Sequence, residues 1–163
     1  MKILAIGDVV GTKTLAYLKK TLWEERKKLG ADFVVANGEN ASDIHGICAA
    51  DAEELLSAGV DMITLGNHSF GRRDICGMLS DSQSIIRPAN YPVCVPGSGC
   101  SILNICGWRI LTINVLGTAL MEKANFGMSM VVAPAYLLHL KLSQFLPFFT
   151  FGMAEYSLQA VLL

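Results

Sequence analysis

The chain has 163 residues, a net charge of −1 and 17% charged residues. This length suits one domain with its own hydrophobic core. The near-neutral charge argues against a stable nucleic-acid surface held by bulk electrostatics. Charge is unevenly distributed, because Lys141 and Glu155 are the only charged side chains between residues 125 and 163. We therefore treat residues 1–124 as the ordinary domain and residues 125–163 as an apolar tail.

The cysteines indicate a reducing compartment. The chain has five of them, no two closer than six residues, and none forms a C-x-x-C pair. An odd number without an export signal is typical of reduced thiols in a cytoplasmic protein. The apolar run that follows Lys2 ends before Asp8 and is too short for the core of a signal peptide.

The first half of the chain alternates predicted strands and helices. The pattern predicts strands at residues 2–6, 33–36 and 62–65, helices at residues 14–29 and 49–58, and a tight loop at residues 7–11. Short connections between alternating strands and helices are typical of a parallel sheet, so we predict an α/β fold. Ligands of such sheets bind outside the carboxyl ends of the strands.

The second half is less regular. Residues 87–92 contain two prolines and predict an irregular loop, and residues 101–105 and 109–115 predict a β-hairpin. The tail shows no clear alternation of strands and turns. Its longest stretch without a charged residue is residues 124–140, shorter than the roughly 20 residues of a membrane-spanning helix. We expect no membrane span, and we interpret residues 125–163 as foreign to the domain, as a frame change or truncation of the gene would produce.

Polar side chains end each of the three predicted parallel strands. Asp8 follows the first strand, Glu39 and Asn40 follow the second, and Asn67 and His68 follow the third. Because these ends share one edge of the sheet, the five side chains should converge there. Oxygen and imidazole ligands suit divalent metals. An alternative for Asp8 alone is a cap of the next helix.

Other candidates are weaker. His45 follows Asn40 in a loop, and we take it as a surface residue. Arg72, Arg73 and Arg87 could bind an anion, although each one alone is better explained as a solvated surface residue. The chain lacks the G-x-G-x-x-G, G-x-x-x-x-G-K-[ST] and G-x-S-x-G motifs, which disfavours dinucleotide, P-loop and serine-hydrolase functions.

Four segments carry a resemblance to a known family. They are Ile6-Gly7-Asp8-Val9-Val10-Gly11, Ala36-Asn37-Gly38-Glu39-Asn40-Ala41, Leu65-Gly66-Asn67-His68 and Arg87-Pro88-Ala89-Asn90-Tyr91-Pro92. From residue 1 to about residue 123, the chain resembles the calcineurin-like metallophosphoesterase superfamily. Within it, the chain is similar to the bacterial branch of 2',3'-cyclic-nucleotide 2'-phosphodiesterases. The general superfamily has Asp-x-His where this chain has Asp8 and Val10, and the narrow branch makes the same change.

This resemblance implies a two-metal phosphodiesterase. Asp8 and Asn40 would bind the first metal, Glu39 would bridge both, and Asn67 would bind the second. His68 would protonate the leaving oxygen while a hydroxide attacks phosphorus in line. The implied cofactors are two divalent metal ions. Fe or Mn is favoured, and Mg or Zn is the alternative. The implied fold is a metallophosphoesterase-like sandwich, with a parallel-rich sheet flanked by helices.

The chain departs from the family in its second half. The family completes its site with three further histidines, two of them in a Gly-His-Thr-His-like motif, and no such motif occurs here. His139 lacks matching surroundings and receives no role. We therefore expect a truncated sandwich that lacks the family's second half and second sheet, with weaker metal binding.

Two hypotheses follow for the function. The first is a metal-dependent phosphodiesterase acting on a cyclic nucleotide or another small phosphodiester, with activity impaired unless a second chain supplies the histidines. The second is a non-catalytic truncated fragment whose apolar tail drives association, for example into homo-oligomers. A third hypothesis, a membrane-attached module, depends only on the tail. The interrupted apolar stretches of the tail argue against it.

Overall fold

A computed structural model describes the chain except for residues 44, 118–148, 155–156 and 163. The described residues form two four-stranded sheets. The first is parallel, in the order β1 (Ile3–Val10), β2 (Phe33–Asn40), β3 (Met62–Thr64) and β4 (Ile85–Ile86). The second is antiparallel, in the order β5 (Cys100–Ile105), β6 (Trp108–Leu116), β8 (Ser157–Leu162) and β7 (Phe149–Ala154).

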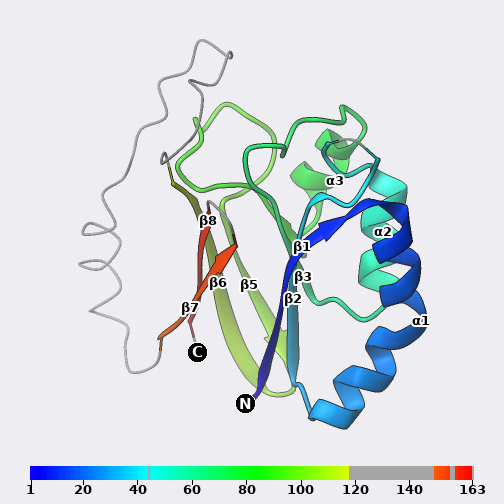
Figure 1. Cartoon of the computed structure of the whole chain (residues 1–163). Coiled ribbons are helices and arrows are strands. Elements are labelled where there is room, and N and C mark those ends of the chain that lie inside the picture. Colours follow the sequence, from blue (N-terminus) through cyan, green and yellow to red (C-terminus); the bar gives the residue numbers. More distant parts are fainter. Residues whose placement is uncertain (44, 118–148, 155–156, 163) are drawn as a thin grey trace.

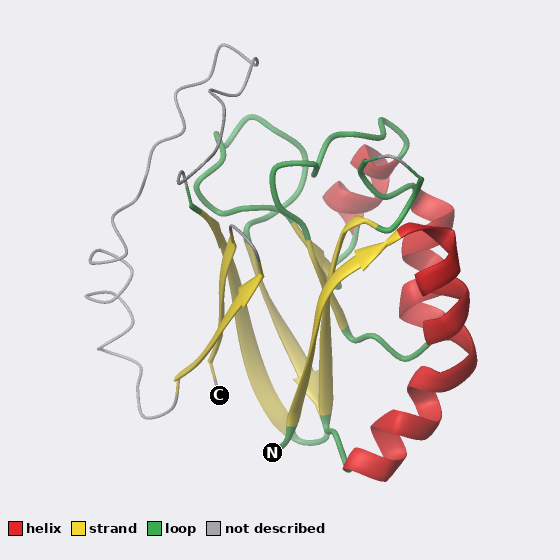
Figure 2. Ribbon diagram, viewed as in Figure 1, coloured by secondary structure: helices red, strands yellow, loops and turns green. Residues whose placement is uncertain are grey.

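The molecule has three layers (Figure 1). Helices α1 (Gly11–Leu29), α2 (Ala49–Ser57) and α3 (Ile75–Asp81) lie on one side of the parallel sheet, and the antiparallel sheet lies on the other (Figure 2). The prediction of an α/β fold with a parallel-rich sheet and flanking helices is confirmed. No helix of the described part is both long and apolar enough to cross a membrane.

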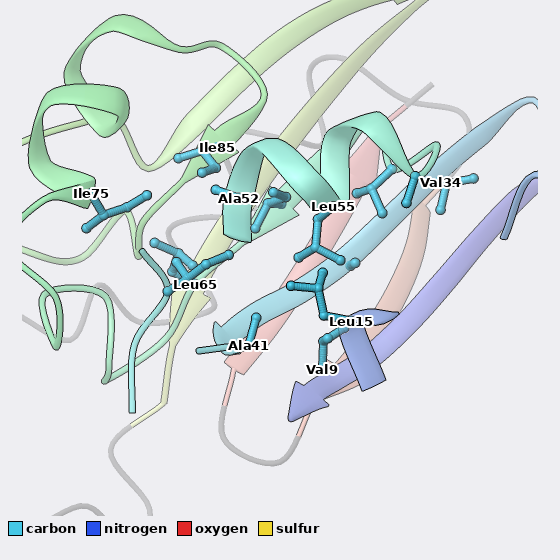
Figure 3. Close-up of a cluster of buried hydrophobic side chains, with 14 of the residues drawn as sticks. Val9, Leu15, Val34, Ala41, Ala52, Leu55, Leu65, Ile75 and Ile85 are labelled. Atoms are coloured by element: carbon cyan, nitrogen blue, oxygen red, sulfur yellow. The ribbon is translucent and has the colours of Figure 1, made fainter. Parts of the chain in front are cut away.

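Strand β2 shows how the sequence builds both cores. Side chains alternate between the two faces of a strand. Val34 and Ala36 belong to the core beneath the helices, shown in part in Figure 3 with Leu15 of α1 and Leu55 of α2. The alternate residues of β2 belong to the core between the sheets, whose buried members are Phe33, Val35, Met62, Ile86 and Ile110. Both faces of the parallel sheet are thus covered, which explains its continuous apolar strands.

Several predicted boundaries were wrong. Strand β1 continues to Val10, where a loop was predicted, because it stays paired with β2 as far as Asn40. The pairing is irregular on both sides of Asp8. Helix α1 begins at Gly11 rather than at residue 14. Helix α3 and the two-residue strand β4 were not predicted, since such short segments carry little periodicity.

The prediction that a second sheet would be missing was also wrong. The predicted hairpin forms as β5 and β6. Two strands of the tail extend this sheet, since β8 pairs with β6 and β7 pairs with β8. The tail therefore forms strands although its sequence shows no clear alternation. The predicted boundary at residue 124 lies outside the described residues, and it stays a prediction.

Candidate metal and phosphate site

The structure brings together four of the five predicted site residues. Nδ2 of Asn40 donates hydrogen bonds to Oδ2 and Oδ1 of Asp8, at 2.9 and 3.2 Å. Oδ1 of Asn40 lies 2.8 Å from Nδ1 of His68. The main-chain N–H of His68 donates to Oε2 of Glu39 at 2.9 Å. The ends of β1 and β2 and the turn after β3 are thus joined by side-chain contacts across the sheet edge.

Glu39 is held at its place by its neighbours. Its main-chain N–H donates to Oδ1 of Asn37 at 3.1 Å, and Nδ2 of Asn37 lies 3.5 Å from Oε1 of Glu39. The carboxylate lies directly against Gly66, where a β-carbon would be 2.5 Å from Oε2. Real β-carbons do not approach an oxygen so closely, so this placement of the carboxylate requires glycine at position 66.

Asn67 is the fifth predicted residue, and it stands apart. Its side chain is exposed in the turn after β3. Within the described part of the chain, no hydrogen bond joins it to Asp8, Glu39, Asn40 or His68. The structure therefore places Asn67 next to the cluster along the chain, but outside its hydrogen-bond network.

His45 was taken as an ordinary surface residue, and the structure places it at the site. Its ring centroid lies 4.3 Å from that of His68, with the ring planes inclined by 36°. The side chain is exposed, as predicted. Only the fold of the loop after β2 brings the two rings together, and no periodicity or motif in the sequence marks this approach.

Tyr91 is a second residue that the sequence analysis did not assign. Its hydroxyl donates to the main-chain oxygen of Gly66 at 3.2 Å, and its ring stacks on Phe70 with centroids 6.0 Å apart. Burial, and then the nearby Glu39 carboxylate, raise the pKa of Tyr91 to about 12, while the charge of Arg87 acts in the opposite direction. Tyr91 thus stays protonated at neutral pH and acts as a donor that holds the turn carrying His68.

Two of the three candidate arginines, Arg72 and Arg87, donate to main-chain oxygens. Arg87 is buried, so its interpretation as a surface residue was wrong. Its guanidinium donates to the main-chain oxygens of Pro88, at 2.8 Å, and Pro96, at 3.4 Å. Burial lowers the pKa of Arg87, and Cys100, Cys94 and Tyr91 oppose this shift through the negative charge that each acquires when deprotonated. Arg72 donates to the main-chain oxygen of Asp43, and its side chain is thereby engaged.

The donor set fits a divalent cation in its chemistry. Asp8 and Glu39 supply carboxylate oxygens, and Asn40 and Asn67 supply amide oxygens, the ligands preferred by hard cations. The carboxylate of Asp8 is already met by the positive end of the Asn40 amide, which indicates a site suited to positive charge. In the described residues, however, no group of three or more His, Cys, Asp or Glu side chains is arranged to hold a metal ion. A metal here would therefore depend on the asparagines.

One described cavity lies away from these residues. It is open, has a volume of about 1010 Å³, and is lined by α3, by the loop from Cys94 to Ser98 and by the adjoining strands. None of the five predicted site residues lines it.

The fold and this cluster of carboxylates, amides and imidazoles define a metallophosphoesterase-like protein. Residues 4–140 match the model of the YmdB-like protein family. The chain belongs to that family, and the resemblance seen in the sequence is confirmed.

Relatives of known sequence or structure agree with this assignment. The 2',3'-cyclic-nucleotide 2'-phosphodiesterase of Bacillus subtilis is 34% identical over 117 residues, which cover 72% of this chain and 44% of the relative. A solved hypothetical protein of Thermus thermophilus has 35% identity and a TM-score of 0.69, over 76% of this chain and 48% of its own. A novel phosphatase of Mycoplasma pneumoniae has 27% identity and a TM-score of 0.75, over 88% of this chain and 51% of its own. The chain thus spans about half the length of these relatives.

Proposed function

We propose that this chain carries the first half of a metal-dependent phosphodiesterase site that hydrolyses a cyclic nucleotide or another small phosphodiester. The observation that supports the proposal best is the fixed position of His68. Its ring nitrogen Nδ1 contacts Asn40, and its main-chain N–H donates to Glu39. The relatives support the reaction class, because one is a phosphodiesterase and another a phosphatase. In this proposal two divalent metal ions, Fe or Mn before Mg or Zn, are the cofactors.

His68 has the arrangement of a general acid. Because Oδ1 of Asn40 can only accept, Nδ1 of His68 carries the hydrogen of their contact. Nε2 is then the ring nitrogen that delivers a proton to the leaving oxygen as its bond to phosphorus breaks. Histidine changes protonation near neutral pH, which suits it to this transfer. After the transfer the ring is neutral and the leaving group is an alcohol.

The other residues would hold the cations and order the site. Asp8 and Asn40 would bind one metal, Glu39 would bridge both, and Asn67 would bind the other. When bound, divalent cations neutralise the charge of the phosphoryl group and activate the attacking water. Glu39 also accepts from the main chain of His68, so the same carboxylate that would bridge the metals orients the turn that carries the acid.

Metal analysis and a turnover assay test the proposal. The purified chain is loaded with Mn²⁺ or Fe²⁺, its metal content is measured, and hydrolysis of bis-p-nitrophenyl phosphate is followed. We expect bound metal and a turnover that falls by about 10²- to 10⁴-fold in His68→Ala, the usual contribution of a general acid. Lys20→Gln, on the exposed surface of α1, is the control and should keep both.

The outcome separates the two hypotheses for this chain. A well-folded sample without bound metal and without turnover would exclude the enzyme and favour the non-catalytic fragment. Turnover that survives unchanged in His68→Ala would exclude the proposed acid. Addition of a separately produced second half of a relative tests whether missing ligands limit the rate.

A further inference from the structure

The loop between β2 and α2 presents His45 to the site. Its imidazole lies against that of His68, with 4.3 Å between the ring centroids. The five residues assigned above do not include His45. Its ring nonetheless lies against His68, the residue proposed to protonate the leaving oxygen.

The main chain anchors the segment that carries His45. The N–H of Gly46 donates to the main-chain oxygen of Glu39 at 2.7 Å, and the N–H of Ser42 donates to that of Gly46 at 3.1 Å. Gly46 has a φ of +85°, and a β-carbon there would lie 3.0 Å from the main-chain nitrogen of Arg72. This conformation favours glycine and fits tightly against the next loop. The main chain next to His45 is therefore held at the site by hydrogen bonds.

The imidazole of His45 is available to a ligand. It is exposed, and it makes no hydrogen bond to another described residue. Nδ1 of His68 is engaged by Asn40, which leaves Nε2 as the ring nitrogen that could contact a substrate. With the rings in contact, an oxygen bound at Nε2 of His68 and another oxygen on the same phosphorus would both lie near the two imidazoles.

The charge of the site favours a further donor near the phosphate. Asp8 and Glu39 place two carboxylates where an anionic phosphoryl group would bind. Among the arginines considered as anion ligands, Arg72 and Arg87 donate to main-chain oxygens. His45 is a neighbouring side chain whose ring N–H can be donated to a phosphate without breaking a hydrogen bond to another described residue.

From this juxtaposition we propose that His45 is a phosphate-binding residue. It donates a hydrogen bond to a non-bridging oxygen of the phosphoryl group whose leaving oxygen is protonated by His68. The ligand class is the anionic phosphate of a mono- or diester. This role rests on the proposed function, because it assumes that the phosphoryl group binds beside His68.

Histidine NMR tests the role without relying on turnover. The full chain, which has three histidines, is labelled with ¹³C at the histidine ring and titrated with inorganic phosphate in excess Mg²⁺. His45→Gln and His68→Gln assign the two ring signals. We expect both signals to shift along one binding curve. We also expect His45→Gln to weaken phosphate binding by about 3- to 10-fold, because an exposed charge-assisted hydrogen bond is lost.

Two further variants make the result specific. His45→Lys places an N–H donor with a positive charge at the end of a side chain. It should restore most of the affinity, which a merely structural role of the ring would not allow. Lys20→Gln removes one positive charge far from the site along α1 and should leave the affinity unchanged.

The outcomes distinguish the role of His45 from the proposed phosphodiesterase function. A shift of His68 alone, or an unchanged affinity in His45→Gln, would overturn the role of His45 and leave the proposed phosphodiesterase intact. Turnover without a shift of either ring would do the same. If neither ring shifts and no turnover is found, both proposals are wrong for this chain.

Discussion

Replacing Gly66 by alanine should displace Glu39 with little other damage. A β-carbon built at this position lies 2.5 Å from Oε2 of Glu39 and 2.6 Å from its carboxyl carbon. The φ of Gly66 is not positive, so alanine can adopt the same main-chain conformation. The crowding atoms belong to the end of a flexible side chain, so the carboxylate will rotate away and the main chain will stay.

The cost of this rotation can be worked from the contacts that it breaks. The N–H of His68 loses its charged acceptor, now at 2.9 Å. A hydrogen bond to a charged group contributes about 1.5–3 kcal/mol. Alanine returns about 0.4–1 kcal/mol by restricting the unfolded chain. We therefore expect Gly66→Ala to lower the free energy of unfolding by about 1–2 kcal/mol. If Glu39 bridges metals, Mn²⁺ affinity should fall by at least about 10-fold.

Urea unfolding, amide hydrogen exchange and Mn²⁺ titration measure these effects. The amide of His68 should exchange faster in Gly66→Ala, while the amides in the centre of β2 should not change. Gly77→Ala in α3 is the matched control, because a β-carbon there meets nothing within 4 Å. It should be neutral or slightly stabilising. A Gly66→Ala protein with unchanged stability, unchanged exchange at His68 and unchanged Mn²⁺ affinity would refute the reasoning.

Two further predictions concern stability. Arg26→Ala should cost about 2–4 kcal/mol, because Arg26 and Asp61 form a largely buried ion pair at 2.9 Å, with side chains 13% and 18% exposed. Urea unfolding measures this loss, and Lys28→Ala, at a side chain 74% exposed, should change stability by less than about 0.5 kcal/mol. The second prediction concerns Tyr91, whose folded-state pKa of about 12 lies above the ordinary value near 10. The native state holds this proton more tightly than the unfolded chain. The resulting stability is present below about pH 10 and is lost as the pH rises through about 12. Between about pH 10 and pH 12, the free energy of unfolding should fall by about 1–2 kcal/mol less in Tyr91→Phe than in the wild type. Urea unfolding at a series of pH values measures this difference.

Each of these predictions has a result that contradicts it. Equal stability of Arg26→Ala and Lys28→Ala would show that the buried ion pair adds nothing beyond an exposed one. For Tyr91, an identical loss of stability at high pH in the wild type and in Tyr91→Phe would show that another group titrates there. The comparison is made between slopes with pH, because the variant also loses the hydrogen bond to Gly66 at every pH.

The outline of the site was predictable because of a simple rule of topology. Parallel strands carry their carboxyl ends to one edge, so Asp8, Glu39, Asn40 and His68 had to approach one another once the strands were recognised. The rule says nothing of loops, and His45 and Tyr91 reach the site through loops after β2 and β4. Their positions follow from main-chain hydrogen bonds and from a glycine of positive φ at position 46, which leave no periodic trace in the sequence.

The sequence by itself determined the α/β alternation, the strand ends that carry polar residues and the family to which the chain belongs. Local periodicity and residue chemistry are enough for the first two, because each depends on neighbours along the chain. The family follows from the resemblance of four short segments to known members. The tertiary structure decided what depends on contacts between distant segments. It buried Arg87, paired strands of the tail with β6, fitted Gly66 against Glu39 and placed the ring of His45 on that of His68.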